Sequence, residues 1–128
     1  FNQVIKRFPN SKYSKDSRQK IILVNSNIAA KHMEIGRFYL NNKKYFAALN
    51  RFKIVVNEFS FTKFTPEALH RMVEAYYEMG IYEESYNTAA LLGYNYPDSK
   101  WYKLSYNLVE QIDGEETFLK KIRNFFDG

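Results

Sequence analysis

The chain has 128 residues, no cysteine and a formal net charge of +5, and 45% of its residues are hydrophobic, 18% aromatic. Such a composition excludes a wholly disordered chain, and the lack of cysteine excludes disulfides and thiolate metal sites. No apolar run reaches the about 18 residues that a membrane-spanning helix needs, so we expect no such helix.

Positive charge is spread along the sequence rather than gathered at one place. Lysines and arginines are mixed with glutamates, and the densest basic groups lie at 12–20, 43–44 and 120–123. A dispersed pattern of this kind is typical of solvated helix faces. We therefore expect no nucleic-acid partner.

The first nine residues predict the end of a helix. The residue before a proline disfavours the helical conformation, so this helix ends before Pro9. The apolar spacing matches the late positions of a helical repeat, which predicts a partial repeat over residues 1–9. Because the partner helix would lie upstream, we expect Phe1, Val4 and Ile5 to form an unusually apolar surface that contacts a neighbouring molecule or frays.

A long helix is predicted over Lys12–Asn41. The segment has no proline and one glycine, and its apolar residues recur with roughly helical spacing: Ile21, Val24, Ile28 and Ile35. At 1.5 Å per residue such a helix is about 45 Å long, so we expect it to span two layers of a helical stack. The polar stretch Asn25–Asn27 is where a kink is easiest, but nothing there forces a break.

Residues 29–60 match a tetratricopeptide repeat, a helix–turn–helix unit of about 34 residues. The end of the long helix is its first helix, Asn41–Lys44 its turn and Tyr45–Glu58 its second helix. The small residues Gly36 and Ala48 stand at repeat positions 8 and 20, where two helices cross closely. Three aromatic side chains are expected to fill the space around this crossing: Tyr39, Tyr45 and Phe52.

A second unit is predicted over residues 66–97. Its first helix begins with Thr65 as the N-cap and Pro66 at the first helical position. It ends at Gly80, which we expect in a left-handed conformation. The second helix of the unit is Tyr82–Leu92 and ends before the next glycine.

Capping helices are predicted over residues 99–128. One runs from about Ser99 to Ile112, and the last one, Glu115–Phe126, follows a capping box made by Asp113 and Glu116. The apolar residues of the last helix lie on one face: Phe118, Leu119, Ile122, Phe125 and Phe126. Such a helix caps a repeat stack, and partner binding is the alternative for it.

The predicted fold is therefore all-α, a tetratricopeptide-like right-handed stack (α-solenoid) of about seven helices that forms a single domain over residues 1–128. Known catalytic and nucleotide-binding motifs are absent from the sequence. His32 and His70 lack the neighbours of a metal site. We expect His32, which stands at repeat position 4, to have a core or groove role. We expect neither an enzyme nor a cofactor.

Two motifs carry a more specific resemblance. FPNSKYSKDSR (Phe8–Arg18) leads into the long helix, and FYLNNKKYFAALNR (Phe38–Arg51) runs from its end through the turn into the next helix. The pattern P-x-S-x-aromatic occurs at both Pro9 and Pro97. This combination resembles the C-terminal half of the BamD family, also called ComL or YfiO, over about Phe1–Leu108.

The sequence departs from the family pattern at two places: Ser17 stands where alanine is usual, and Asn57–Ser60 lacks the usual Tyr-Pro. The resemblance implies a non-catalytic scaffold for outer-membrane β-barrel protein assembly, at the periplasmic face of the outer membrane. It implies that this chain is the half that binds the POTRA domain of BamA. Membrane association would come only from a lipid anchor upstream of this sequence.

The same resemblance implies a partner-binding site around Arg51, which matches a family arginine near the BamA interface. A planar guanidinium is suited to pair with a carboxylate. The other candidate residues are Tyr39, Asn42, Phe46 and Asn50. The alternative for Arg51 is an ordinary helix arginine that braces Glu34, Glu58 or a helix end.

Two other functions stay open. One is a different periplasmic repeat adaptor of the CpoB-like type. The other is a generic cytoplasmic adaptor that captures a peptide in its concave groove. An upstream signal peptide ending in a lipidated cysteine would favour the BamD family.

Overall fold

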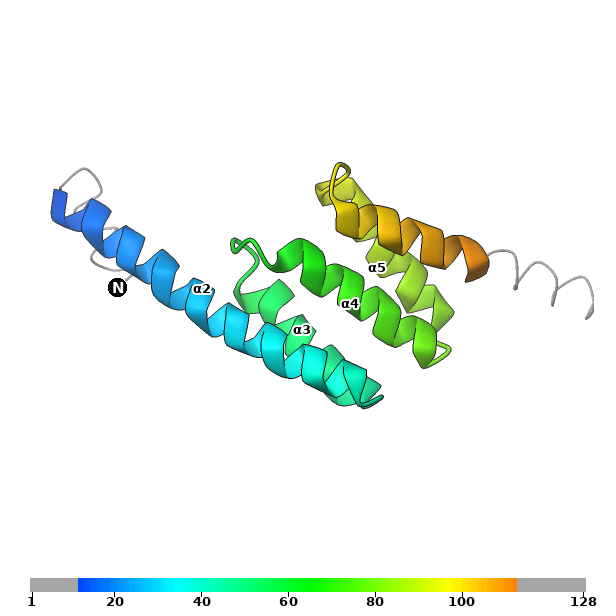
Figure 1. Ribbon diagram of the computed structural model, residues 1–128. Coiled ribbons are helices and arrows are strands. Elements are labelled where there is room, and N and C mark those ends of the chain that lie inside the picture. Colours follow the sequence, from blue (N-terminus) through cyan, green and yellow to red (C-terminus); the bar gives the residue numbers. More distant parts are fainter. Residues whose placement is uncertain (1–11, 113–128) are drawn as a thin grey trace, which may run out of the picture.

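The computed structural model describes residues 12–112, and side chains from residue 15 onward. Four helices are bounded on both sides: α2 (Lys12–Asn41), α3 (Tyr45–Glu58), α4 (Thr65–Glu78) and α5 (Tyr82–Asn95). A further helix covers residues 100–112 (Figure 1). No strand occurs between residues 12 and 112, and the protein is an all-α helical repeat stack.

Several predictions concern the ends of the chain and lie outside the described residues. These are the partial repeat over residues 1–9, the apolar surface of Phe1, Val4 and Ile5, and the last helix Glu115–Phe126. The expected total of about seven helices depends on these ends as well.

Helices that follow one another in sequence pack against one another. α2 contacts α3, α3 contacts α4 and α4 contacts α5, while α2 also reaches α4. α2 is continuous through its polar Asn25–Asn27 stretch, and Figure 1 shows its first half extending beyond the rest of the stack. There Ile22, Leu23 and Val24 are about half exposed or more. Among the described residues, therefore, only the second half of α2 is packed into a layer.

The close crossing of α2 and α3 is built around Gly36. A Cβ atom placed on Gly36 would lie 2.6 Å from the ring of Phe52, and both Phe52 and Ala48 are fully buried. The predicted role of the small residues at the two crossing positions is confirmed, as is the contribution of Phe52 to the space between the helices.

A second glycine has a different role from the predicted one. The sequence indicated that the helix after Tyr82 ends at Leu92, but α5 continues through Gly93 to Asn95. A Cβ atom on Gly93 would overlap the ring of Tyr102. The predicted helix end was wrong. Gly93 does not end α5; instead, its missing side chain allows α5 and the 100–112 helix to approach each other closely.

The two ends of α4 differ in how well they were predicted. Gly80, which follows the C-cap residue Met79, has a φ of 76°, and this confirms its left-handed conformation. At the start, the predicted N-cap was wrong, since Thr65 is the first helical residue and the N-cap is Phe64. The Thr65 hydroxyl donates to the carbonyl of Ser60 at 2.9 Å, so it fastens the preceding loop instead of capping the helix.

The hydrophobic core forms two clusters, and α4 contributes to both. Eight of the 14 residues of α4 are buried, because this helix packs between α3 and α5 and needs a wide apolar arc. The larger cluster joins α2 to α5 and includes Met33, Leu49, Phe52, Val55, Leu69, Met72, Tyr76 and Leu92. The smaller one includes Val73, Ala89, Val109 and Ile112, and it attaches the 100–112 helix to the stack.

Candidate partner-binding site

The turn between α2 and α3 is held by a compact set of hydrogen bonds. The amide of Asn42 donates to the carbonyls of Phe38 at 3.1 Å and Tyr39 at 3.2 Å, and its side-chain Nδ2 donates to the Phe38 carbonyl at 2.7 Å. Lys43 adopts a left-handed φ of 61°, which lets the chain reverse, and the amide of Lys44 donates to the Tyr39 carbonyl at 2.9 Å. Because the last carbonyls of α2 are satisfied, the turn is a defined end of the hairpin.

Two phenylalanine side chains are exposed beside this turn. Phe46 on α3 is 67% exposed and Phe38 on α2 is 63% exposed. Asn42 and Asn50 are exposed as well, and Asn50 lies one helical turn beyond Phe46 on α3. The end of the α2–α3 hairpin therefore presents aromatic and amide groups to solvent; we call Phe38, Asn42, Phe46 and Asn50 the hairpin surface.

Phe38 is not among the site residues predicted from the sequence. Most aromatic residues fall at the packing positions of the repeat, which favours a place in the core for them. Phe38 stands at repeat position 10, between the packing positions of Gly36 and Tyr39. That offset was the signal that its side chain faces away from the helix crossing.

Tyr39 supports the hairpin surface but is not itself exposed on it. Its side chain is half-buried and packs against the main core cluster. Its ring centroid lies 6.0 Å from that of Phe38 in an edge-to-face arrangement. Tyr39 thus connects the core to the exposed ring of Phe38.

Arg51 is half-buried on α3, next to the exposed Asn50. Its Nη1 lies 3.3 Å from Nδ1 of His32 on α2. A guanidinium only donates hydrogen bonds, so the Nδ1 atom of His32 accepts this one. Neither Glu34 nor Glu58 forms an ion pair with Arg51 in the described part of the chain. The guanidinium of Arg51 is therefore oriented by the ring nitrogen of His32, and no carboxylate in the described part of the chain pairs with it.

A charged network joins α2 to α4 on another part of the stack. The Nε and Nη2 atoms of Arg37 each donate to one carboxylate oxygen of Glu67 at 2.7 Å. Arg71 donates to Glu67 at 3.3 Å and to Glu74 at 2.8 Å. Burial acts to raise the pKa of Glu67, but the hydrogen bonds and charges of the two arginines outweigh it, and the pKa lies below its usual value. Nothing local in the sequence points to the Arg37 contact, because its partner is 30 residues away.

His70 packs inside the protein. It is 5% exposed; its Nδ1 lies 2.7 Å from the hydroxyl of Ser105, and its Nε2 lies 3.4 Å from a carboxylate oxygen of Glu74. Burial lowers the pKa of His70 below its usual value. Ser105 is fully buried, so a substrate cannot reach its hydroxyl. This arrangement links α4 to the 100–112 helix and does not form a nucleophile site.

Over residues 15–112, no three histidine, aspartate or glutamate side chains gather in a way that would hold a metal ion. None of the described helices has the length and apolar character needed to cross a membrane.

Comparison with known proteins gives the family. The family model described as "YfiO: Outer membrane lipoprotein" matches residues 1–92. The chain belongs to the YfiO family. An outer membrane protein assembly factor BamD from Rickettsia prowazekii is 49% identical over 110 residues, which are 86% of this chain and 44% of that protein. BamD of Caulobacter vibrioides is 47% identical over 106 residues, which are 83% of this chain and 35% of that protein.

More distant relatives carry the same name. BamD of Neisseria meningitidis serogroup A is 28% identical over 99 residues, 77% of this chain and 37% of that protein. The chain thus spans less than half the length of the curated relatives it matches. The hairpin surface and Arg51 lie inside the part matched by the YfiO model, whereas residues 93–128 lie beyond it.

Proposed function

We propose that this chain is a non-catalytic scaffold in outer-membrane protein assembly and works at the periplasmic face of the outer membrane. The relatives at 49% and 47% identity are named outer membrane protein assembly factors, and the family is described as an outer membrane lipoprotein. A stack of helices suits such a role, because it offers an extended surface for protein contacts. A lipid anchor upstream of this sequence would hold the longer protein at the membrane.

The proposed contact is the hairpin surface, and the proposed partner is the periplasmic POTRA domain of BamA. The observation that carries this proposal is the pair of phenylalanines that are 63% and 67% exposed at the end of a hydrogen-bonded hairpin. Exposed aromatic side chains on a rigid support commonly become the central anchors of a protein interface. The amides of Asn42 and Asn50 would supply polar contacts at the rim.

Arg51 has the chemistry to add specificity to this contact. His32 orients its guanidinium through a neutral acceptor, so the positive charge remains available to a carboxylate on the partner. Arginine can form two parallel hydrogen bonds with a carboxylate, and such a pair strengthens when the partner excludes water from it. Tyr39 supports the site from below, because it packs on the core and against Phe38.

A titration of purified protein with isolated BamA POTRA domains tests the proposal. Phe46→Ala should weaken binding by about 2 kcal/mol, as truncation of an aromatic anchor does. Arg51→Glu should weaken it by about 2–5 kcal/mol, as loss of one partner of a desolvated charged pair does. The matched controls are Phe61→Ala, another exposed phenylalanine, and Lys31→Glu, an exposed cation on α2; both should bind like the parent.

Two outcomes would contradict the proposal. Unchanged POTRA affinity in both test variants would remove the hairpin surface as the contact. An Arg51→Glu variant with a lowered melting temperature and unchanged affinity would show that Arg51 is a structural residue held by His32.

The family match favours this proposal over another tetratricopeptide adaptor, either CpoB-like or cytoplasmic. An adaptor of that kind would bind a peptide tail in its concave groove and would show no saturable binding of POTRA domains. The same titration therefore distinguishes the two classes.

A further inference from the structure

The outward side of α5 is an uncharged surface. The opposite side of this helix is buried against the stack, and there the hydroxyl of Ser85 donates to the carbonyl of Val73 at 3.0 Å. From residue 86 to the end of the helix, every exposed residue is uncharged: Tyr86, Asn87, Ala90, Leu91, Tyr94 and Asn95. At 100° per residue these six residues fall within about half of the helix circumference. We call them the α5 face.

Large apolar side chains dominate the α5 face. Tyr94 is 87% exposed, more than any other large hydrophobic side chain within residues 15–112, and Tyr86 and Leu91 are 50% and 48% exposed. Protein interfaces are depleted of charged residues and enriched in tyrosine. The α5 face therefore has the composition of a contact surface, unlike a solvated helix side with mixed charges.

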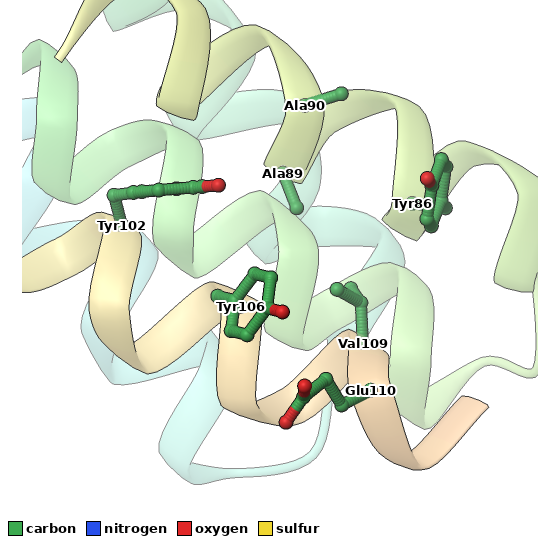
Figure 2. Close-up of a pocket in the computed structure, with 7 residues that line it drawn as sticks. All are labelled: Tyr86, Ala89, Ala90, Tyr102, Tyr106, Val109 and Glu110. Carbon is green, nitrogen blue, oxygen red and sulfur yellow. The ribbon is translucent and has the colours of Figure 1, made fainter. Parts of the chain in front are cut away.

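The helix that carries this face is held firmly. Figure 2 shows Ala89 pointing toward the 100–112 helix, whereas Ala90 points away from it. Ala89 and Val109 are only 3% and 6% exposed, so α5 packs closely on its inner side. Tyr86 stands beside the groove of about 300 Å³ that the two helices form. The exposed side chains are thus presented on a rigid support.

The order of residues on the α5 face is the same in both directions. Residues four apart lie above one another on a helix, so the face consists of two rows, Tyr86–Ala90–Tyr94 and Asn87–Leu91–Asn95. Each row has the same residue type at its two ends. In a two-fold symmetric contact a surface meets the same surface of the second copy. An antiparallel pair of α5 helices therefore places tyrosine toward tyrosine and asparagine toward asparagine, with the alanine and the leucine at the centre.

Charge favours this antiparallel orientation. Glu83 and Glu84 are exposed in the first turn of α5. A parallel pair would bring the four carboxylates of two copies together, whereas an antiparallel pair keeps them at opposite ends, and like charges repel. The chain has a formal net charge of +5, so two copies approach most easily where the surface carries no charge.

We propose that the α5 face is a contact between two copies of this chain, which pack antiparallel about a two-fold axis near Ala90. The distance between packed helices depends on the side chains at the contact, so the alanine in the centre of its row permits a close approach. Offset or edge-to-face contacts between the tyrosine rings stabilise the pair beyond the area that they bury. The proposal goes beyond the proposed function and does not depend on it.

The size of the α5 face predicts a weak dimer. Because a tyrosine buries about 150–250 Å², the exposed parts of Tyr86 and Tyr94 amount to about 270 Å² per copy. A standard stable interface buries about 800 Å² and about 20–30 residues on each side, and the α5 face has six residues. We therefore expect dimers that form as the protein concentration rises and that dissociate on dilution.

Disulfide formation tests the contact directly, because the chain has no cysteine of its own. Ala90→Cys places one thiol of each copy near the two-fold axis, and Asn57→Cys, an exposed position on α3, is the control. Since a disulfide needs Cα atoms within about 7 Å of each other, we expect Ala90→Cys to form linked dimers at least about tenfold faster than Asn57→Cys under the same mild oxidation.

Sedimentation equilibrium tests the same contact without a covalent link. Over about 10 μM to 1 mM protein, a range that covers weak dissociation constants, the mean mass of the parent should rise toward that of a dimer. Tyr94→Glu should remain a monomer, because symmetry brings two new carboxylates into an uncharged contact. Phe61→Glu, at a phenylalanine that is 59% exposed elsewhere, should behave like the parent. Added salt should strengthen the dimer, since it screens the repulsion between two positively charged copies.

Three results would overturn the proposal. The first is a parent that stays monomeric over the whole range, together with equal oxidation rates for the two cysteine variants. The second is a dimer that Tyr94→Glu leaves intact or that salt weakens, because another, charged surface would then form it. The third is a monomeric parent whose affinity for isolated POTRA domains falls in Tyr94→Glu, which would assign the α5 face to that partner instead of a second copy.

Discussion

Neutralising Glu67 should weaken the stack measurably, because this carboxylate holds α2 and α4 together. The Glu67 side chain is 12% exposed, while those of Arg37 and Arg71 are 38% and 26% exposed. Breaking a fully buried ion pair costs about 3–5 kcal/mol, and an exposed pair contributes about 0–1 kcal/mol. With the carboxylate nearly buried and both arginines partly solvated, we expect Glu67→Gln to lower the free energy of unfolding by about 2 kcal/mol. In a chain of this size that lowers the melting temperature by about 8 °C.

Urea denaturation followed by circular dichroism at pH 7 measures this loss. Glu78→Gln, an exposed position on the same helix, is the matched control and should change stability by less than about 0.5 kcal/mol. A double-mutant cycle of Glu67→Gln with Arg37→Ala should give a coupling of about 1–2 kcal/mol. A Glu67→Gln loss no larger than that of the control, or a coupling near zero, would refute the reasoning.

The pH dependence of the same pair of proteins provides an independent check. Folding lowers the pKa of Glu67, so its contribution is fully present above the unfolded-state pKa and is lost as pH falls through the folded-state value. The stability difference between the parent and Glu67→Gln should therefore shrink in acid. A difference that stays constant from neutral to strongly acidic pH would mean that the charge of Glu67 is not what stabilises the network.

Three further results are expected. Gly36→Ala should cost about 1–3 kcal/mol of unfolding free energy, because its Cβ meets the Phe52 ring, and an added Phe52→Leu should recover part of it. Since burial lowers the pKa of His70, the free energy of unfolding measured by denaturation should fall as pH drops below about 6.5. His70→Gln should flatten this dependence on pH, and an unchanged slope would exclude His70 as its source. Phe46→Ala should leave the free energy of unfolding within about 0.5 kcal/mol, and a larger loss would give this exposed residue a structural role.

Local sequence signals predicted most helix positions correctly. α2 and α3 have the bounds that the apolar spacing and the polar turn indicated. Gly80 stops α4 in a left-handed conformation, because an achiral residue adopts positive φ at little cost. These features depend on residues within one or two turns of each other, so the order of residues along the chain is sufficient to specify them.

The repeat pattern also predicted part of the packing, while the candidate site residues come from the resemblance to the family. Gly36 and Ala48 stand where two helices cross, and the ring of Phe52 fills the gap that the glycine leaves. The resemblance to the family motif brought out Phe46, Asn50 and Arg51 as site candidates. It did not bring out the exposed Phe38, because exposure depends on how α2 is rotated against α3.

Tertiary structure alone decided the contacts between residues far apart in sequence. Arg37 and Glu67 are 30 residues apart, and His70 and Ser105 are 35 apart. Neither pair leaves a local pattern, since each partner looks like an ordinary helix residue by itself.

Glycine and threonine signals near the helix ends show the same limit. Gly93 has the form of a helix stop, yet α5 passes through it because the ring of Tyr102 needs the space of the missing side chain. Thr65 has the form of an N-cap, yet its hydroxyl bonds to the loop carbonyl of Ser60. The sequence by itself determined where helices form and which faces are apolar, since these follow from local spacing. Only the packed stack decided which role each ambiguous residue takes, because that choice depends on which distant side chain lies against it.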